Sequence, residues 1–161
     1  MGYKLHYSKS IITRAANTTA YNTFSLLSDA SNLPPAIPMR FDKSKLVYLV
    51  SIGVMFNWAL APASSSVRVY LTSENPGSIT DQASNTSFNL SPIYDSFLGK
   101  YFFNTVNDGA GNQYGYLNVS PPLAITSSTS SLYAVVELAN GITNTVSSGQ
   151  IKFIAGFEEP F

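Results

Sequence analysis

The stretch Leu46 to Leu60, LVYLVSIGVMFNWAL, is the longest apolar run of the chain and contains its only tryptophan. Read with the two-residue period of a β-strand, it separates into two sets of side chains, one uniformly large and one small or mixed. The large set is Leu46, Tyr48, Val50, Ile52, Val54, Phe56, Trp58 and Leu60; the other is Val47, Leu49, Ser51, Gly53, Met55, Asn57 and Ala59. A helix would spread the large residues around its circumference. The pattern therefore predicts a long central strand that buries the large set.

A membrane-spanning helix is the alternative for this run. It is disfavoured because a bilayer needs about 20 apolar residues and because Ser51, Gly53 and Asn57 interrupt the stretch. No membrane partner is expected.

The composition favours a single folded domain that associates with other proteins. The chain has 161 residues, 45% of them hydrophobic and only 11% charged, with a formal net charge of zero. A nucleic-acid partner is not expected, because the basic footprint that such binding needs is missing. Ten Tyr and ten Phe beside so little charge indicate surfaces buried between subunits. The absence of cysteine excludes disulfides, thiolate metal sites and cysteine nucleophiles.

The remaining segments indicate several further strands separated by turns. Residues 3–7 form a short edge strand or an arm, and 11–27 contain two weak strands. Pro34, Pro35 and Pro38 predict a loop, and Ser91-Pro92 predicts one or two helical turns ending near Gly99. Further strands are expected at 67–72, antiparallel to the central strand, and at 100–106, 114–119, 123–126, 131–138 and 150–157, with a break at Pro121-Pro122.

These elements predict an all-β fold, a single antiparallel β-sandwich of jelly-roll type with at most one short helix near residues 92–98. Residues 1–10 are expected to form an N-terminal arm or edge strand, residues 11–157 the sandwich, and residues 158–161 a C-terminal tail. The N-terminus shows neither a secretory signal nor a myristoylation motif, which favours synthesis in the cytoplasm.

No group of residues indicates catalysis, a metal or a cofactor. His6 is the only histidine, which excludes a multi-histidine metal cluster, and the nine acids are dispersed along the chain. The segment Asp108 to Asn112 reads as a glycine-rich hairpin tip rather than a calcium loop. Four N-x-Ser/Thr matches, at Asn17, Asn85, Asn89 and Asn118, are expected by chance. The tyrosines fit a core or a subunit interface better than a sugar site.

The two ends of the chain are the expected contacts with other subunits or with a capsid. Tyr3, Lys4 and Tyr7 form a cationic aromatic arm, and Glu158, Glu159 and Phe161 form an anionic aromatic tail. Both are expected to lie outside the core strands, ordered on assembly by strand addition or pocket insertion. Deleting Glu158 to Phe161 is then expected to leave the melting temperature of the isolated domain nearly unchanged.

One region resembles a known family. Residues 67–76, VRVYLTSENP, followed by a Ser/Thr/Asp-rich connection, a Phe and a capped turn reaching Phe97-Leu98-Gly99, resemble small auxiliary head proteins of tailed bacteriophages. The segment Leu132 to Val136, with its closing strand, is similar to the same pattern. The resemblance spans about residues 46–157, and the departures are the proline-rich loop at Leu33 to Pro38 and the Phe-ended tail.

The resemblance implies a capsid decoration or cement protein, a β-sandwich subunit that is often trimeric and braces the major capsid proteins from outside the shell. The function expected is therefore that of a non-enzymatic virion structural protein at the capsid surface. Its expected partners are the major capsid protein and further copies of itself, with a trimer favoured. A fibre-tip or adhesin-like module that binds carbohydrate is the first alternative, and a secreted hydrolase is the second.

Overall fold

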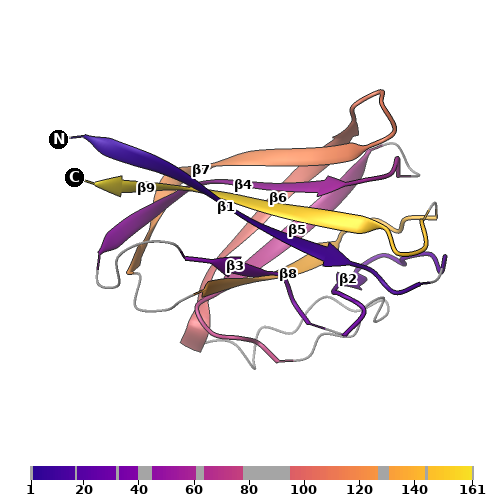
Figure 1. The fold of residues 1–161 in the computed structure, drawn as a ribbon, viewed down its shortest axis with the longest axis horizontal. Coiled ribbons are helices and arrows are strands. Elements are labelled where there is room, and N and C mark those ends of the chain that lie inside the picture. The colour runs from indigo at the N-terminus through magenta and orange to yellow at the C-terminus, as the bar shows by residue number, and fades with distance from the viewer. Residues whose placement is uncertain are drawn as a thin grey trace.

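The computed structural model describes residues 2–16, 18–31, 33–39, 45–60, 64–77, 95–126, 131–143 and 145–160. Within these residues the chain forms nine strands (Figure 1). They are β1 (Tyr3–Thr13), β2 (Leu26–Leu27), β3 (Ala36–Pro38), β4 (Leu46–Phe56), β5 (Ser65–Thr72), β6 (Phe97–Asn107), β7 (Gln113–Thr126), β8 (Ser131–Leu138) and β9 (Gln150–Pro160).

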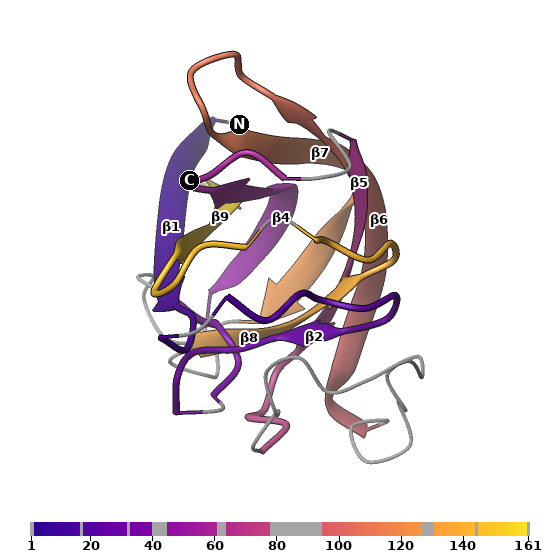
Figure 2. The ribbon, with the colours of Figure 1, turned by 90° about the vertical axis from the view of Figure 1, so that its right-hand side faces the viewer.

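The strands form one curled antiparallel sheet in the order β1-β9-β4-β7-β6-β5-β8-β2, with β3 also paired to β8. The sheet folds over at the β6–β7 hairpin, so that the layer β1-β9-β4-β7 faces the layer β6-β5-β8 with β2 and β3 (Figure 2). Each layer alternates strands from the two halves of the chain, which is the order of a jelly roll with β2 and β3 sharing one strand position. The predicted all-β jelly-roll sandwich is therefore confirmed.

The structure corrects three local predictions. The segment 67–72 lies in β5, which pairs with β6 and β8 and not with β4, because β9 and β7 occupy both edges of β4. The proline-rich loop includes the strand β3; β3 pairs with β8 alone, and an edge strand tolerates the donor that Pro38 lacks. Asp95 and Ser96 form a 3₁₀ turn and β6 begins at Phe97, whereas residues 91–94 lie outside the described residues.

A β-bulge in β4 divides the central strand into two halves with opposite phase. Leu49 pairs with Phe157 of β9 and Ser51 pairs with Gly156, so Val50 is one residue extra on β4. The large apolar residues buried before the bulge are therefore Val47 and Leu49, and those buried after it are Ile52, Val54, Phe56, Trp58 and Leu60. The predicted core face is correct from Ile52 onward and wrong from Leu46 to Val50, because a bulge shifts the two-residue period by one.

The other neighbour of β4 is irregular at the same level. Leu49 pairs with Leu123 of β7, but Ser51 pairs with Asn118, so several residues of β7 around Pro121-Pro122 leave the ladder. The predicted break at the two prolines is therefore a gap in pairing within one continuous strand. Proline has no N–H to donate, which explains why the ladder lapses there.

Arg14 fixes the C-terminal end of β1. Its guanidinium is buried, and it donates hydrogen bonds to the Thr19 carbonyl (3.0 Å), the Val146 carbonyl (3.0 Å) and the Tyr21 hydroxyl (3.2 Å). Its carbon Cζ also lies 5.0 Å from the centroid of the Tyr21 ring. Buried charges need such partners, and these tie the end of β1 to two surrounding loops.

The bulge gives a sharp test of the core. Leu49→Ala should lower the free energy of unfolding by about 2–5 kcal/mol, because it empties a fully buried site. Val50→Ala, one residue later on the partly exposed side, should cost less than about 1 kcal/mol. Urea denaturation of the two variants measures the difference. A uniform two-residue period would require the reverse order.

Candidate interaction surface

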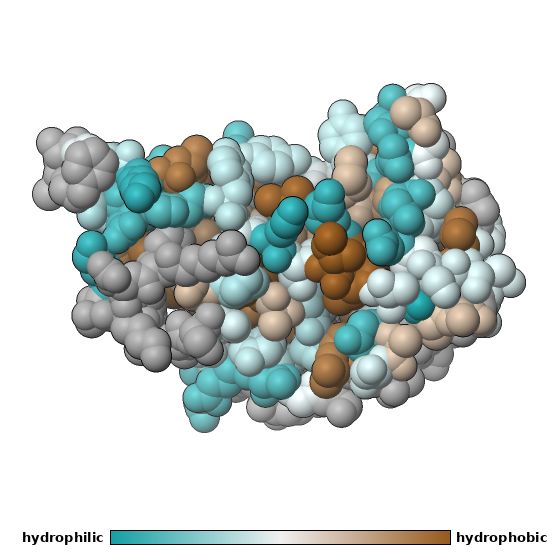
Figure 3. All heavy atoms as spheres, viewed as in Figure 1, coloured by the Kyte–Doolittle hydropathy of each residue, from teal (hydrophilic) through white to brown (hydrophobic). Residues whose placement is uncertain are grey.

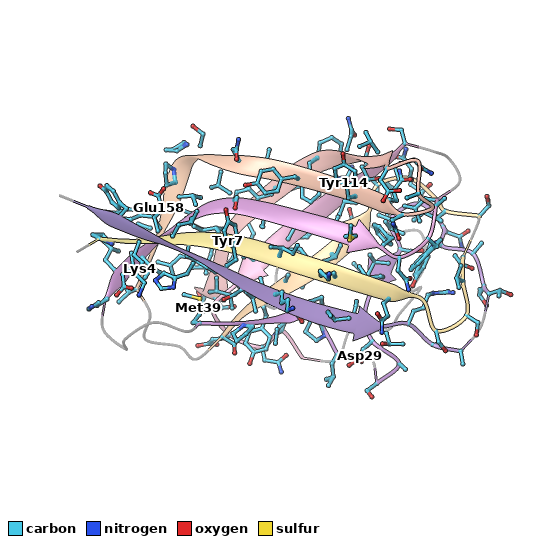
Figure 4. All side chains as sticks on the ribbon, turned by 45° about the horizontal axis from the view of Figure 1, so that its top comes forward. Lys4, Tyr7, Asp29, Met39, Tyr114 and Glu158 are labelled. Atoms are coloured by element: carbon cyan, nitrogen blue, oxygen red, sulfur yellow. The ribbon has the colours of Figure 1, made fainter. Side chains whose placement is uncertain are left out.

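Among the described residues, most of the exposed large apolar side chains lie on the outer face of the β1-β9-β4-β7 layer. Along each strand one set of residues fills the core, and the alternate set points outward. We call this surface the tyrosine face, and it consists of Tyr3, Leu5, Tyr7, Lys9 and Ile11 of β1, Tyr114 and Tyr116 of β7, and Lys152 and Ile154 of β9. Figure 4 shows Tyr7 and Tyr114 on different strands of this layer. A gathered aromatic and apolar surface of this kind is typical of interfaces.

The middle of the tyrosine face is hollowed. A hollow of about 600 Å³ is lined by Tyr7, Lys9, Tyr116, Lys152 and Ile154. Its charged lining residues are both lysines, so the hollow favours an anionic or electron-rich occupant.

Two glycines explain the shape of this hollow. A Cβ built on Gly156 would lie 3.1 Å from the Tyr7 ring, and one built on Gly53 would lie 3.4 Å from the Tyr116 ring. The two rings therefore lie directly against the backbone of Gly156 and Gly53, where no side chain intervenes. Aromatic rings cover glycines in other β-sheets in the same way.

The outer face of the opposite layer is covered over β5 and β8 and exposed over β6, where Phe102 and Val106 face solvent. Glu137 is fully buried, and its Oε1 accepts a hydrogen bond from Arg68 Nη1 at 2.6 Å, with the Phe24 ring stacked near the guanidinium (5.1 Å). Tyr70 is also buried there, and this burial, followed by the charge of Glu137, raises the pKa of its phenol. Arg68 and Glu137 thus bind each other within the protein over β5 and β8, whereas the tyrosine face is open.

The structure brings the predicted contact residues of the two ends together at one end of the sheet. Tyr3 and Tyr7 belong to the tyrosine face, and Glu158 lines a second hollow of about 300 Å³ with Tyr3, Tyr48 and Pro122. Figure 4 shows Lys4 and Glu158 near the end of the layer where both termini lie. Phe161 lies outside the described residues.

The N-terminal segment forms an edge strand, the second of the two expected alternatives, and residues 158–160 belong to β9 rather than to a separate tail. In β1 and β9, Tyr3 pairs with Pro160, Lys4 with Glu159 and Leu5 with Glu158. The boundaries expected after residues 10 and 157 both fall inside these strands. The segment from Glu158 to Pro160 therefore continues the sheet. The sheet tolerates Pro160 because it is the last residue of β9, where its missing N–H removes no hydrogen bond from the ladder.

Glu159 joins three segments of the chain. Its Oε1 accepts a hydrogen bond from Lys45 Nζ at 3.0 Å, and its Oε2 lies 3.2 Å from His6 Nε2. The hydrogen bond from Lys45, aided by His6, holds the pKa of the Glu159 carboxyl below its ordinary value. The only histidine thus contacts a carboxylate at the end of the sheet.

At the tip of the β6–β7 hairpin, the carboxylate of Asp108 is hydrogen-bonded to neighbouring residues of the same loop. Asp108 Oδ1 accepts hydrogen bonds from the backbone N–H groups of Ala110 (2.8 Å) and Asn112 (3.0 Å), and Oδ2 accepts one from the Asn112 amide (2.8 Å). These bonds, the Asn112 amide first, lower the pKa of Asp108. Among the residues that the structure describes, no three His, Asp or Glu side chains are grouped as a metal site would need.

Sequence reasoning missed most of the tyrosine face. Lys9, Tyr116, Lys152 and Ile154 were not predicted as contacts, although the alternate positions of the segments 113–119 and 150–157 carry them. The outward-facing set of each predicted strand was the available signal. It could not be assembled into one surface without knowing that β7 and β9 flank β4.

Comparison with known proteins finds similarity at the level of fold. No protein-family model matches the chain, and no curated protein matches it. Similar solved structures include tobacco necrosis virus, with a TM-score of 0.38, 10% identity and coverage of 99% of this chain and 96% of that chain. The acidic stable capsid structure of Helicobacter pylori bacteriophage KHP30 has a TM-score of 0.34 and 15% identity, with coverage of 99% of this chain and 95% of that chain. Mud crab tombus-like virus has a TM-score of 0.36 and 10% identity, with coverage of 99% of this chain and 81% of that chain.

Similarity at this level does not define a function for the chain, and the jelly-roll assignment rests on the strand order described above. In the described part of the chain, none of the helical segments has the length and apolar character that crossing a bilayer requires.

Removing the C-terminal segment should destabilise the protein, contrary to the expectation from sequence. Deleting residues 158–161 removes the partners of Tyr3, Lys4 and Leu5 and both contacts of Glu159 described above. A loss of about 1 kcal/mol or more corresponds to a fall of about 2–4 °C or more in melting temperature for a chain of this size. Calorimetry measures this. An unchanged melting temperature would show that the last residues of β9 contribute nothing to the fold.

The lowered pKa of Glu159 predicts an acid-dependent contribution to stability. A carboxyl whose pKa is lower in the folded state stabilises the protein above its unfolded pKa, near 4.5, and that stabilisation is lost as the pH falls through the folded value. Glu159→Gln should therefore be less stable than wild type at pH 7, and the difference should be smaller at pH 3. Thermal melts at both pH values measure it. In a Lys45→Met background the difference at pH 7 should shrink, since Lys45 is the main cause of the shift.

Proposed function

We propose that the protein is a non-enzymatic structural subunit of a virus particle, a decoration or cement protein that binds the outer shell and links major capsid proteins. The observation that carries this proposal is the tyrosine face, an open apolar surface with lysines as its charged members. The jelly-roll fold and the resemblance of residues 67–76 to auxiliary head proteins are consistent with it.

The chemistry of the face fits repeated attachment better than catalysis. Tyr114 and Tyr116 offer rigid aromatic surface with a polar tip, the type of side chain that dominates binding energy at interfaces. Many subunits, each making a modest contact, hold a shell together through multivalency. The lysines of the hollow favour an acidic patch on the capsid protein as the partner surface. Self-association belongs to the proposal, and sedimentation distinguishes the trimer implied by the resemblance from other stoichiometries.

Particle binding of two matched variants tests the proposal. Tyr116→Ser should reduce the number of copies on particles of the virus that encodes the chain, with a loss of apparent affinity of about tenfold or more if Tyr116 is an anchor. The control is Phe102→Ser on β6, because Phe102 is 52% exposed against 54% for Tyr116 and lies in the opposite layer. Occupancy is measured by quantitative gel or cryo-electron microscopy. Absence of the protein from purified particles would refute the proposal.

A carbohydrate-binding module is the second candidate, favoured by the rings of Tyr7 and Tyr116 on either side of the hollow. Aromatic rings beside a hollow stack on the apolar faces of sugars. Binding on a glycan array, abolished by Tyr116→Ser, together with absence from particles, would favour this function over the first.

A further inference from the structure

β1 is a long edge strand with one open side. It pairs with β9 over eleven residues, stands at the end of the strand order, and has no second ladder partner among the described residues. Figures 1 and 3 view the molecule with β1 in front, and Figure 3 shows apolar patches alternating with hydrophilic residues across this side. An edge of this length is a template for a further strand.

Three contacts show which backbone groups of β1 face the open side. In an antiparallel ladder the N–H and C=O of one residue point to the same side, and the side alternates along the strand. Tyr3 lies opposite Pro160, which has no N–H, and Arg14 N–H bonds to the Gly149 carbonyl (3.0 Å) next to β9. The Thr13 carbonyl instead accepts from Ala30 N–H (3.0 Å), outside β9. The odd-numbered residues therefore direct their backbone toward the open edge.

The available part of this edge is symmetric about Tyr7. It begins at Tyr3, where β1 begins, and it ends at Ile11, because the carbonyl of Thr13 is already bound by Ala30. Tyr7 stands at its midpoint and, at 62%, is the most exposed large hydrophobic side chain in the part of the chain that the structure describes.

We propose that two copies of the chain pair through β1, antiparallel, about a two-fold axis at Tyr7. Tyr7 then lies opposite Tyr7 of the second copy, Leu5 opposite Lys9, and Tyr3 opposite Ile11. Aromatic and apolar pairs of this kind stabilise antiparallel strands, and no two like charges lie opposite one another.

Other registers are less favourable. An axis at Lys9 would set two ammonium groups directly opposite, and an axis at Ser8 would bring the same lysines onto a diagonal and would need the Thr13 carbonyl. Registers centred before Tyr7 shorten the ladder. The charge pattern and the Thr13–Ala30 bond thus select one register.

The dimer would join two β1-β9-β4-β7 layers into one continuous sheet and place two tyrosine faces side by side. It is a dimer, in place of the trimer implied by the resemblance. The pairing is independent of particle binding, so a failure of the proposed function leaves this test intact.

Charge substitutions at the axis test the proposal by analytical ultracentrifugation of the full chain at about 50 μM. Wild type should sediment as a dimer, whereas Tyr7→Lys and Tyr7→Glu should each sediment as monomers, because like charges then lie opposite one another. An equimolar mixture of the two variants should restore a dimer, since Lys then faces Glu. The control Tyr116→Lys, at a residue of the same face but on β7, should remain dimeric. Thermal melts confirm that each variant is folded.

Cross-linking tests the register independently. The chain has no cysteine, so Tyr7→Cys should oxidise to a disulfide-linked dimer, because paired Cα atoms at such a position lie about 5.5 Å apart, within the range of a disulfide. Lys9→Cys should not cross-link, since Leu5 lies opposite it. A monomeric or trimeric wild type, a dimeric Tyr7→Lys, or efficient cross-linking through Lys9→Cys in preference to Tyr7→Cys would each overturn the proposal.

Discussion

The single extra residue in β4, Val50, is the constraint on which the arrangement of both faces depends. Because Val50 and Ser51 together oppose Gly156, the strand changes phase between Leu49 and Ile52 and still buries large residues on both sides of the change. A Cβ on Gly156 would collide with Ser51 Oγ, so this partner position accepts only glycine without movement. The bulge thus lets a long strand follow the bend of the layer while keeping its core contacts.

The same bend explains why one outer face is open. After the bulge the outward positions of β4 hold Gly53 and Met55, so the centre of the layer lacks bulk and Tyr7 and Tyr116 lie against it from either side. In the opposite layer, the outward side of β5 and β8 holds the Arg68–Glu137 ion pair, and the Phe24 ring lies against its guanidinium. Truncating Arg68 would remove the ion pair of a fully buried carboxylate, so this pair serves the fold.

The sequence predicted the fold class well, because strand alternation and turn residues are local signals. It could not predict the bulge, since Val50 and its neighbours are equally apolar and the phase is set by the partners Gly156 and Asn118. It placed the contact residues at the ends, where Tyr3 and Tyr7 do lie on the tyrosine face, but it missed that Glu159 is tied to Lys45 and His6 inside one chain. Those contacts join residues far apart in the sequence, and their proximity depends on the order of the strands, which the pattern of one sequence does not predict.

The protein protects its two sheet ends differently, and the difference limits what β1 can do. At the other end, β2 and β3 have only two and three residues, and β3 ends at Pro38, which leaves little edge to pair. On β1 the protection consists of Lys4 and Lys9. A pairing centred on Lys9 would set this lysine against its own copy, whereas antiparallel pairing at Tyr7 keeps the charges apart. Because β9 already occupies the other side of β1, a pair formed through this edge closes on itself and cannot continue into an open-ended stack.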